Sequence, residues 1–202
     1  MPNPVVGWRL WRVHGGDLWS WGIDAEWQPG DGQARCLHPD PQSRCAEAPG
    51  EHCLCGFWAL SDPQHCVRKV RKEHVRLVGT MQPVIGLMLG WGSVMLHGAE
   101  GFRAERARPL CLFDNWIWDS ELDLLTAGRV PWWRRLQDGA GLRSRDRSRR
   151  YRAPVRAAQR FGIPLVTLQA AVQFGVLREL GVASELVQTF ERRLPMVAGR
   201  AA

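Results

Sequence analysis

Apolar residues at the start of the chain fall into two short runs that predict a β-hairpin. Val5, Trp8, Leu10 and Val13 form the first run, and residues 18–21 form the second. Between them lies the turn His14-Gly15-Gly16-Asp17, whose paired glycines can adopt the positive φ angles of a tight turn.

Further β structure is predicted up to about residue 113. Residues 84–96 are apolar and punctuated by Gly86, Gly90 and Gly92, and glycines within a strand usually mark bulges or strong curvature. Residues 102–107 and 110–113 continue the β pattern on either side of a proline, which we expect at a strand edge or kink. The pattern favours a small curved sheet or barrel.

The periodicity changes near the C-terminus. Leu165, Leu168, Val172, Val176 and Leu180 recur every three or four residues, as on one face of a helix. We therefore predict an α+β protein with a β-rich domain over residues 1–130, an Arg-rich connector over 131–152 and a helical tail over 153–202. The stretch 138–150 has almost no apolar side chain, and we interpret it as a linker that is mobile when free.

The start of the tail fits the pattern of a helix-turn-helix. Ala158 stands where two helices would touch, and Gly162 stands four residues later in the turn, between predicted helices over 154–161 and 165–174. The second helix lacks the Arg, Lys or Asn residues that read base edges. An ordinary α-hairpin or a dimerisation surface remains the alternative.

The overall composition, 45% hydrophobic and 23% charged, excludes a disordered or collagen-like chain. The longest uncharged stretch, residues 77–99, contains five glycines and several polar residues, so we interpret it as strand rather than membrane helix. Residues 1–13 lack the basic start and apolar run of a secretory signal. We expect a cytoplasmic protein with no membrane partner.

The net charge of +7 is concentrated in one segment. Residues 134–160 contain ten arginines and two aspartates, which leaves the rest of the chain close to neutral. Such a segment is typical of contacts with phosphate backbones, although a solvated linker has the same composition. The predicted nucleic-acid-binding residues are Arg134, Arg135, Arg143, Arg145, Arg147, Arg149, Arg150, Arg152 and Arg156.

Four of the six cysteines lie within 20 residues of a segment rich in proline and glycine. Cys36, Cys45, Cys53 and Cys55 predict a tetrahedral Zn²⁺ site that is structural, because four thiolates leave no open position for water. A histidine could replace one of the four cysteines, and Cys45 is the first candidate for replacement. The alternative to a zinc site is a set of free thiols that pack as small apolar groups. The neighbouring histidines are His38, His52 and His65.

Two motifs resemble small proteins of GC-rich bacteria for which no activity is known. The first is Cys53-Leu54-Cys55-Gly56-Phe57, and the second is the block over residues 91–105, W-G-x-V-x-x-H-x-x-x-G-F-R-A-E. The resemblance covers about residues 5–113. It implies a single β domain with loop cysteines and implies no chemistry.

One group of residues could support proton transfer. A hairpin over residues 94–107 would bring His97 near Glu100, Arg103 and Glu105, but no nucleophile motif accompanies them. Cross-strand pairing of exposed charges is the structural alternative.

Our leading expectation is therefore a non-enzymatic nucleic-acid-associated protein, with DNA favoured over RNA. An interaction adaptor that uses the C-terminal helices is the second hypothesis, and an enzyme centred on His97 is the third.

Overall fold

The computed structural model describes residues 3–73, 82–114 and 145–193. The predicted hairpin at the start of the chain is confirmed: β1 (Val5–His14) pairs antiparallel with β2 (Asp17–Ser20). Gly15 and Gly16 form the turn with φ angles of 63° and 124°.

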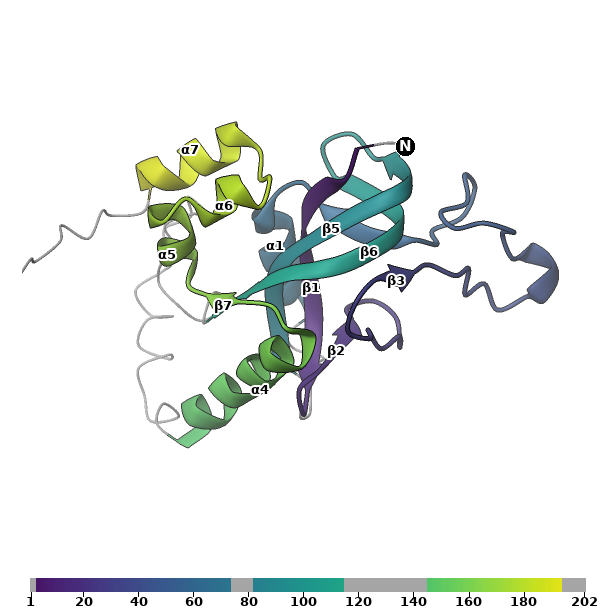
Figure 1. Cartoon of the computed structure of the whole chain (residues 1–202). Coiled ribbons are helices and arrows are strands. Elements are labelled where there is room, and N and C mark those ends of the chain that lie inside the picture. Colours follow the sequence, from purple (N-terminus) through teal and green to yellow (C-terminus); the bar gives the residue numbers. More distant parts are fainter. Residues whose placement is uncertain (1–2, 74–81, 115–144, 194–202) are drawn as a thin grey trace, which may run out of the picture.

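Four strands close into a ring, which forms a small barrel. β1 pairs with β5 (Gln82–Leu96), β5 pairs with β6 (Gly101–Phe113), and β6 pairs with β4 (Phe57–Leu60). The pairing of Trp8 with Leu60 then joins β4 back to β1. This ring is the small, strongly curved β structure that the glycine-punctuated strand predicts (Figure 1).

Close contact inside the ring requires glycine at two positions. A Cβ atom at Gly7 would lie 2.7 Å from the Ala59 Cβ, and one at Gly90 would lie 2.6 Å from the Phe102 ring. The pairing register also shifts opposite Pro109, where the sequence predicts a kink. The strands can therefore approach and bend more than larger residues allow.

Short elements complete the sheet and cover it. β3 (Gly32–Gln33) pairs with β6, and β7 (Leu165–Val166) pairs parallel with the end of β6, so the sheet is mixed. Helix α1 (Pro63–Glu73) follows β4, and the Asp62 carboxylate accepts a hydrogen bond from the Gln64 N–H at its first turn. The remaining helices are α4 (Arg145–Phe161), α5 (Leu168–Gln173), α6 (Val176–Glu179) and α7 (Ser184–Arg193).

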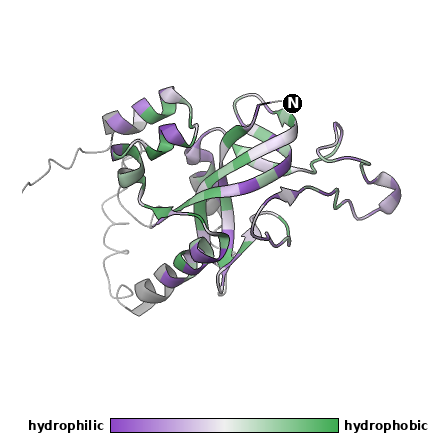
Figure 2. Ribbon diagram, in the orientation of Figure 1, coloured by the Kyte–Doolittle hydropathy of each residue, from purple (hydrophilic) through white to green (hydrophobic). Residues whose placement is uncertain are grey.

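The C-terminal helices share their core with the strands. Leu168, Leu177 and Val187 pack in one cluster with Trp8 and Ile85. In a second cluster, α4 contributes Ala157, Ala158 and Phe161 to the packing around Trp11, Met88 and Leu112. Figure 2 shows hydrophilic and hydrophobic residues intermingled along α4, as expected for a helix that lies half on a sheet. The predicted domain boundary near residue 130 lies outside the described residues.

Two expectations about the C-terminal half are wrong. The predicted linker is helical from Arg145 onward, because arginine is a good helix former and the apolar end of α4 is anchored on the sheet. The second helix of the predicted helix-turn-helix does not begin at Leu165, because residues 165–166 form a strand. Parallel pairing with the end of β6 holds both residues extended, and the Pro164 carbonyl accepts a hydrogen bond from the Leu112 N–H at 3.0 Å.

Within the described residues, no helix is both long enough and apolar enough to cross a bilayer.

Candidate metal centre

The four loop cysteines come together as a possible metal site. The Sγ atoms of Cys36, Cys45, Cys53 and Cys55 all lie within 4.8 Å of one another, and those of Cys36 and Cys53 are 3.7 Å apart. The group includes Cys45, for which the sequence left a histidine as an alternative. Among those alternatives, His38 is exposed and its ring Nδ1 lies 3.2 Å from the Asp40 carbonyl oxygen.

The strands at both ends of the cysteine loop pair with the same strand, β6. β3 before the loop pairs Gly32 with Ala107, and β4 after it pairs Phe57 with Ala104, three residues away on β6. The loop leaves the barrel on the side opposite α5, α6 and α7 (Figure 1). The barrel therefore fixes both ends of a segment that has no regular structure except the 3₁₀ turn η1 (Pro41–Ser43).

Glycines let the cysteine loop fold tightly around the sulfur atoms. The Gly50 N–H donates to Cys55 Sγ at 3.1 Å, and the Gly50 carbonyl accepts from the Cys53 N–H at 3.3 Å. Gly56 has a φ of 110°, and a Cβ there would lie 3.0 Å from the Pro49 Cβ. The glycine of the Cys53–Phe57 motif is thus required by the backbone geometry.

The thiols differ in acidity. Backbone N–H groups of Cys45 and His38 lower the pKa of Cys36 to about 6, because they stabilise its thiolate. Burial and the neighbouring thiols raise the pKa values of Cys45 and Cys55. A bound cation must displace the protons of these thiols, so we expect its affinity to rise with pH.

The other two cysteines belong to the core. Cys66 and Cys111 are fully buried, and burial raises the pKa of each to about 12. They behave as small apolar side chains.

Arg103 on β6 lies beneath the cysteine loop and is 2% exposed. Its Nη1 donates to the carbonyl oxygens of Gly50 at 3.3 Å, of Cys55 at 3.1 Å and of Cys53. Its guanidinium carbon also lies 5.3 Å from the centre of the Trp58 ring. The sequence placed Arg103 in a group of proton-transfer residues and did not reveal its link to the cysteines.

The predicted hairpin around His97 is present, but its charged residues have other contacts. The Arg103 Nε donates to His97 Nε2 at 2.7 Å, and the His97 ring stacks on Trp58 with centroids 4.7 Å apart. Glu105 instead accepts a hydrogen bond from the Ser93 N–H at 3.0 Å, and Glu100 is exposed in the turn. A catalytic role for these residues stays a prediction.

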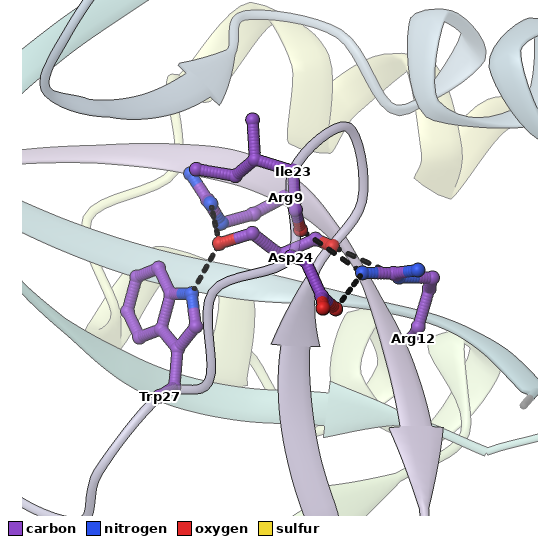
Figure 3. A network of polar contacts seen from close by, with 6 residues as sticks. Arg9, Arg12, Ile23, Asp24 and Trp27 are labelled. Carbon is purple, nitrogen blue, oxygen red and sulfur yellow. Dashed lines mark hydrogen bonds and ion pairs between the residues drawn. The ribbon is translucent and has the colours of Figure 1, made fainter. Parts of the chain in front are cut away.

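Sequence analysis missed a second polar cluster, shown in Figure 3. Arg9 is 9% exposed, and its Nη2 donates to the Ser20 hydroxyl, which also accepts from the Trp27 indole N–H. Arg12 donates to the Ile23 carbonyl and forms an ion pair with Asp24. Burial lowers the pKa of Arg9 to about 9. The cluster ties the segment after β2 to β1, and the only sequence signal for it was an arginine among the aromatic residues of β1.

The predicted nucleic-acid-binding arginines fall into three groups. Arg152 and Arg156 are exposed on α4. The backbone of α4 also includes Arg145, Arg147, Arg149 and Arg150. Outside the described residues are Arg134, Arg135 and Arg143.

The chain matches no protein-family model, and no curated protein or solved structure is detectably similar to it.

Proposed function

We propose that the protein is a non-enzymatic, nucleic-acid-associated protein that binds phosphates through the arginines of α4. The observation that carries this proposal is the state of Arg152 and Arg156. Both are exposed, and no carboxylate of the described residues forms an ion pair with either of them. Exposed guanidinium groups on one helix are well suited to phosphate oxygens.

Five other arginines differ from these two, because each lies within 4 Å of a carboxylate. They are Arg12, Arg106, Arg108, Arg178 and Arg160, the last of them on α4 itself. Arg35, Arg44 and Arg68 are exposed as well, and no carboxylate of the described residues forms an ion pair with them. Helix α4 is distinguished by its density of arginine, with seven arginines and a single aspartate in 17 residues. Like charges at helical spacing repel one another, so a bound polyanion would relieve that repulsion.

The geometry of α4 suits a long polyanion. Its apolar residues Ala157, Ala158 and Phe161 are buried on the sheet, so the helix is held by the barrel. A 17-residue helix is about 25 Å long and can follow several successive phosphates. We propose DNA as the first target, with RNA as the competitor in the same assay.

Zinc is the cation that we propose for the cysteine cluster. A tetrahedral Zn²⁺ with bonds of about 2.3 Å separates its sulfur ligands by about 3.8 Å, close to the 3.7 Å between Cys36 and Cys53. Four thiolates complete the coordination, so the role that we propose is structural. The metal would fix a loop that otherwise has little regular structure.

The adaptor hypothesis has less support. Val172, Val176 and Leu180, the residues expected to meet a partner, pack against the core of the chain itself. Phe174 remains the large exposed apolar residue of this region. An apolar interface of this kind would be nearly insensitive to salt, which separates it from phosphate binding.

The test of nucleic-acid binding is its salt dependence. The affinity of the full chain for a labelled DNA duplex is measured between 50 and 200 mM salt, for the natural sequence and for R152S/R156S. Loss of two phosphate contacts should reduce the slope of log affinity against log salt by about 1.8. R106S/R108S is the matched control, since it removes two positive charges from exposed positions on the sheet. An equal slope in all three proteins would refute the proposal.

The test of zinc is metal analysis of the purified chain, where we expect one zinc per chain. C53S/C55S should lose the metal and lower the melting temperature, whereas H52A, at an exposed histidine in the same loop, should change neither. No zinc in the natural protein would refute this part of the proposal.

A further inference from the structure

Arg103 is a buried cation without an anionic partner in the described structure. Its guanidinium contacts three carbonyl oxygens, a histidine nitrogen and the Met95 sulfur at 3.4 Å, and no carboxylate of the described residues forms an ion pair with it. Burial of a charge is costly unless an opposite charge lies nearby. Arg103 is therefore expected to need a negative charge near its guanidinium.

The four-thiolate cluster can supply that opposite charge. A divalent cation with four thiolates carries a net charge of −2. Two of those thiolates belong to Cys53 and Cys55, whose carbonyl groups accept hydrogen bonds from Arg103. The charge of the loaded centre would thus lie on the same turn whose carbonyl groups the guanidinium binds.

The contacts of Arg103 also hold the cysteine loop. One nitrogen, Nη1, binds the carbonyl groups of Gly50, Cys53 and Cys55, which span the tight turn that carries two ligands. The other side of the guanidinium is held by His97, which stacks on Trp58. Trp58 in turn donates its indole N–H to the Leu54 carbonyl at 2.9 Å, between the two cysteines.

We propose that Arg103 is the positioning residue of the metal centre, which holds the Gly50–Cys55 turn in its ligating shape and balances the negative charge of the thiolates. The inference rests on the proposed zinc site. It assigns to His97 and Trp58 the support of this guanidinium. Groups that orient metal ligands commonly change metal affinity by about 10- to 100-fold when they are removed.

The first measurement is metal affinity in the full chain. Co²⁺ is titrated into the metal-free protein and followed by its thiolate charge-transfer absorption, and Zn²⁺ is then measured by competition. R103M should bind both metals about 10- to 100-fold more weakly. R103K, which keeps the charge but loses the planar fork, should fall between R103M and the natural protein. The control is R106M, at an exposed arginine of the same strand.

The second measurement separates positioning of the metal site from a general contribution to folding. The loss of melting temperature caused by R103M, or by R103K should R103M not fold, is measured in the zinc-loaded protein and again in the C53S/C55S background. If Arg103 positions the metal site, its replacement should lower the melting temperature more in the zinc-loaded protein than in the C53S/C55S background, because part of its effect acts through the metal. Equal losses in both backgrounds, or unchanged Co²⁺ affinity, would overturn the inference while leaving the zinc site intact. Absence of Co²⁺ and Zn²⁺ binding by the natural protein would overturn both.

Discussion

Gly50 offers a sensitive test of the cysteine cluster, because a single methyl group there would meet one of the four sulfur atoms. A Cβ atom at this position would overlap Cys45 Sγ and would lie 3.0 Å from the Cys45 Cβ. The φ angle of Gly50 is not in the left-handed region, so Gly50→Ala adds volume without backbone strain. Carbon and sulfur atoms come into contact at roughly 3.5–4.0 Å, so the sulfur has to move by about 1 Å or more.

The cost can be estimated from the number of ligands. Structural zinc sites contribute about 10–16 kcal/mol in small zinc domains, which corresponds to about 3 kcal/mol for each of four ligands. A sulfur displaced by about 1 Å from a bond of about 2.3 Å no longer coordinates effectively. We therefore expect Gly50→Ala to weaken zinc binding by roughly 100-fold or more.

The assay is competition for Zn²⁺ with a chromophoric chelator, together with thermal melts of the loaded and metal-free protein. Gly50→Ala should lower the melting temperature of the loaded protein and leave that of the metal-free protein nearly unchanged. Gly22→Ala is the control, because nothing lies within 4 Å of a Cβ at that position. Zinc affinity within threefold of the natural value would refute the cluster geometry.

Two further predictions concern the barrel. Gly101→Ala should lower the free energy of unfolding by more than about 3 kcal/mol, because its Cβ would collide with the Ala59 carbonyl oxygen. Gly98 is also at positive φ but has open space around it, so Gly98→Ala should lower the free energy of unfolding by about 1 kcal/mol. Urea unfolding measures both values, and equal losses would contradict the closed ring. Ser20→Ala should lower the free energy of unfolding by about 2–6 kcal/mol, because it leaves the buried N–H donors of Arg9 and Trp27 without their acceptor. The control Ser93→Ala, at an exposed position, should change the free energy of unfolding by no more than about 0.5 kcal/mol. An unchanged stability of Ser20→Ala would show that water replaces the hydroxyl.

Local patterns were sufficient for the elements whose signals are local. Glycine pairs and apolar runs predicted the β1–β2 hairpin, and the density of glycines predicted the curvature of β5. The cysteines could be grouped because all four fall within 20 residues, where few arrangements of the chain keep them apart. Such features depend on backbone preferences and short loops, which a sequence displays directly.

Contacts across the barrel were decided by the tertiary structure alone. Arg103 lies 53 residues from Gly50 and 50 from Cys53, and it reaches them because β4 closes the ring against β6. The strand at residues 165–166 likewise replaced the start of a predicted helix, because it pairs with the end of β6. The periodicity of a segment indicates which of its faces is apolar. The partner of each polar group depends instead on which distant strands pair, and that pairing is decided only when the whole sheet closes.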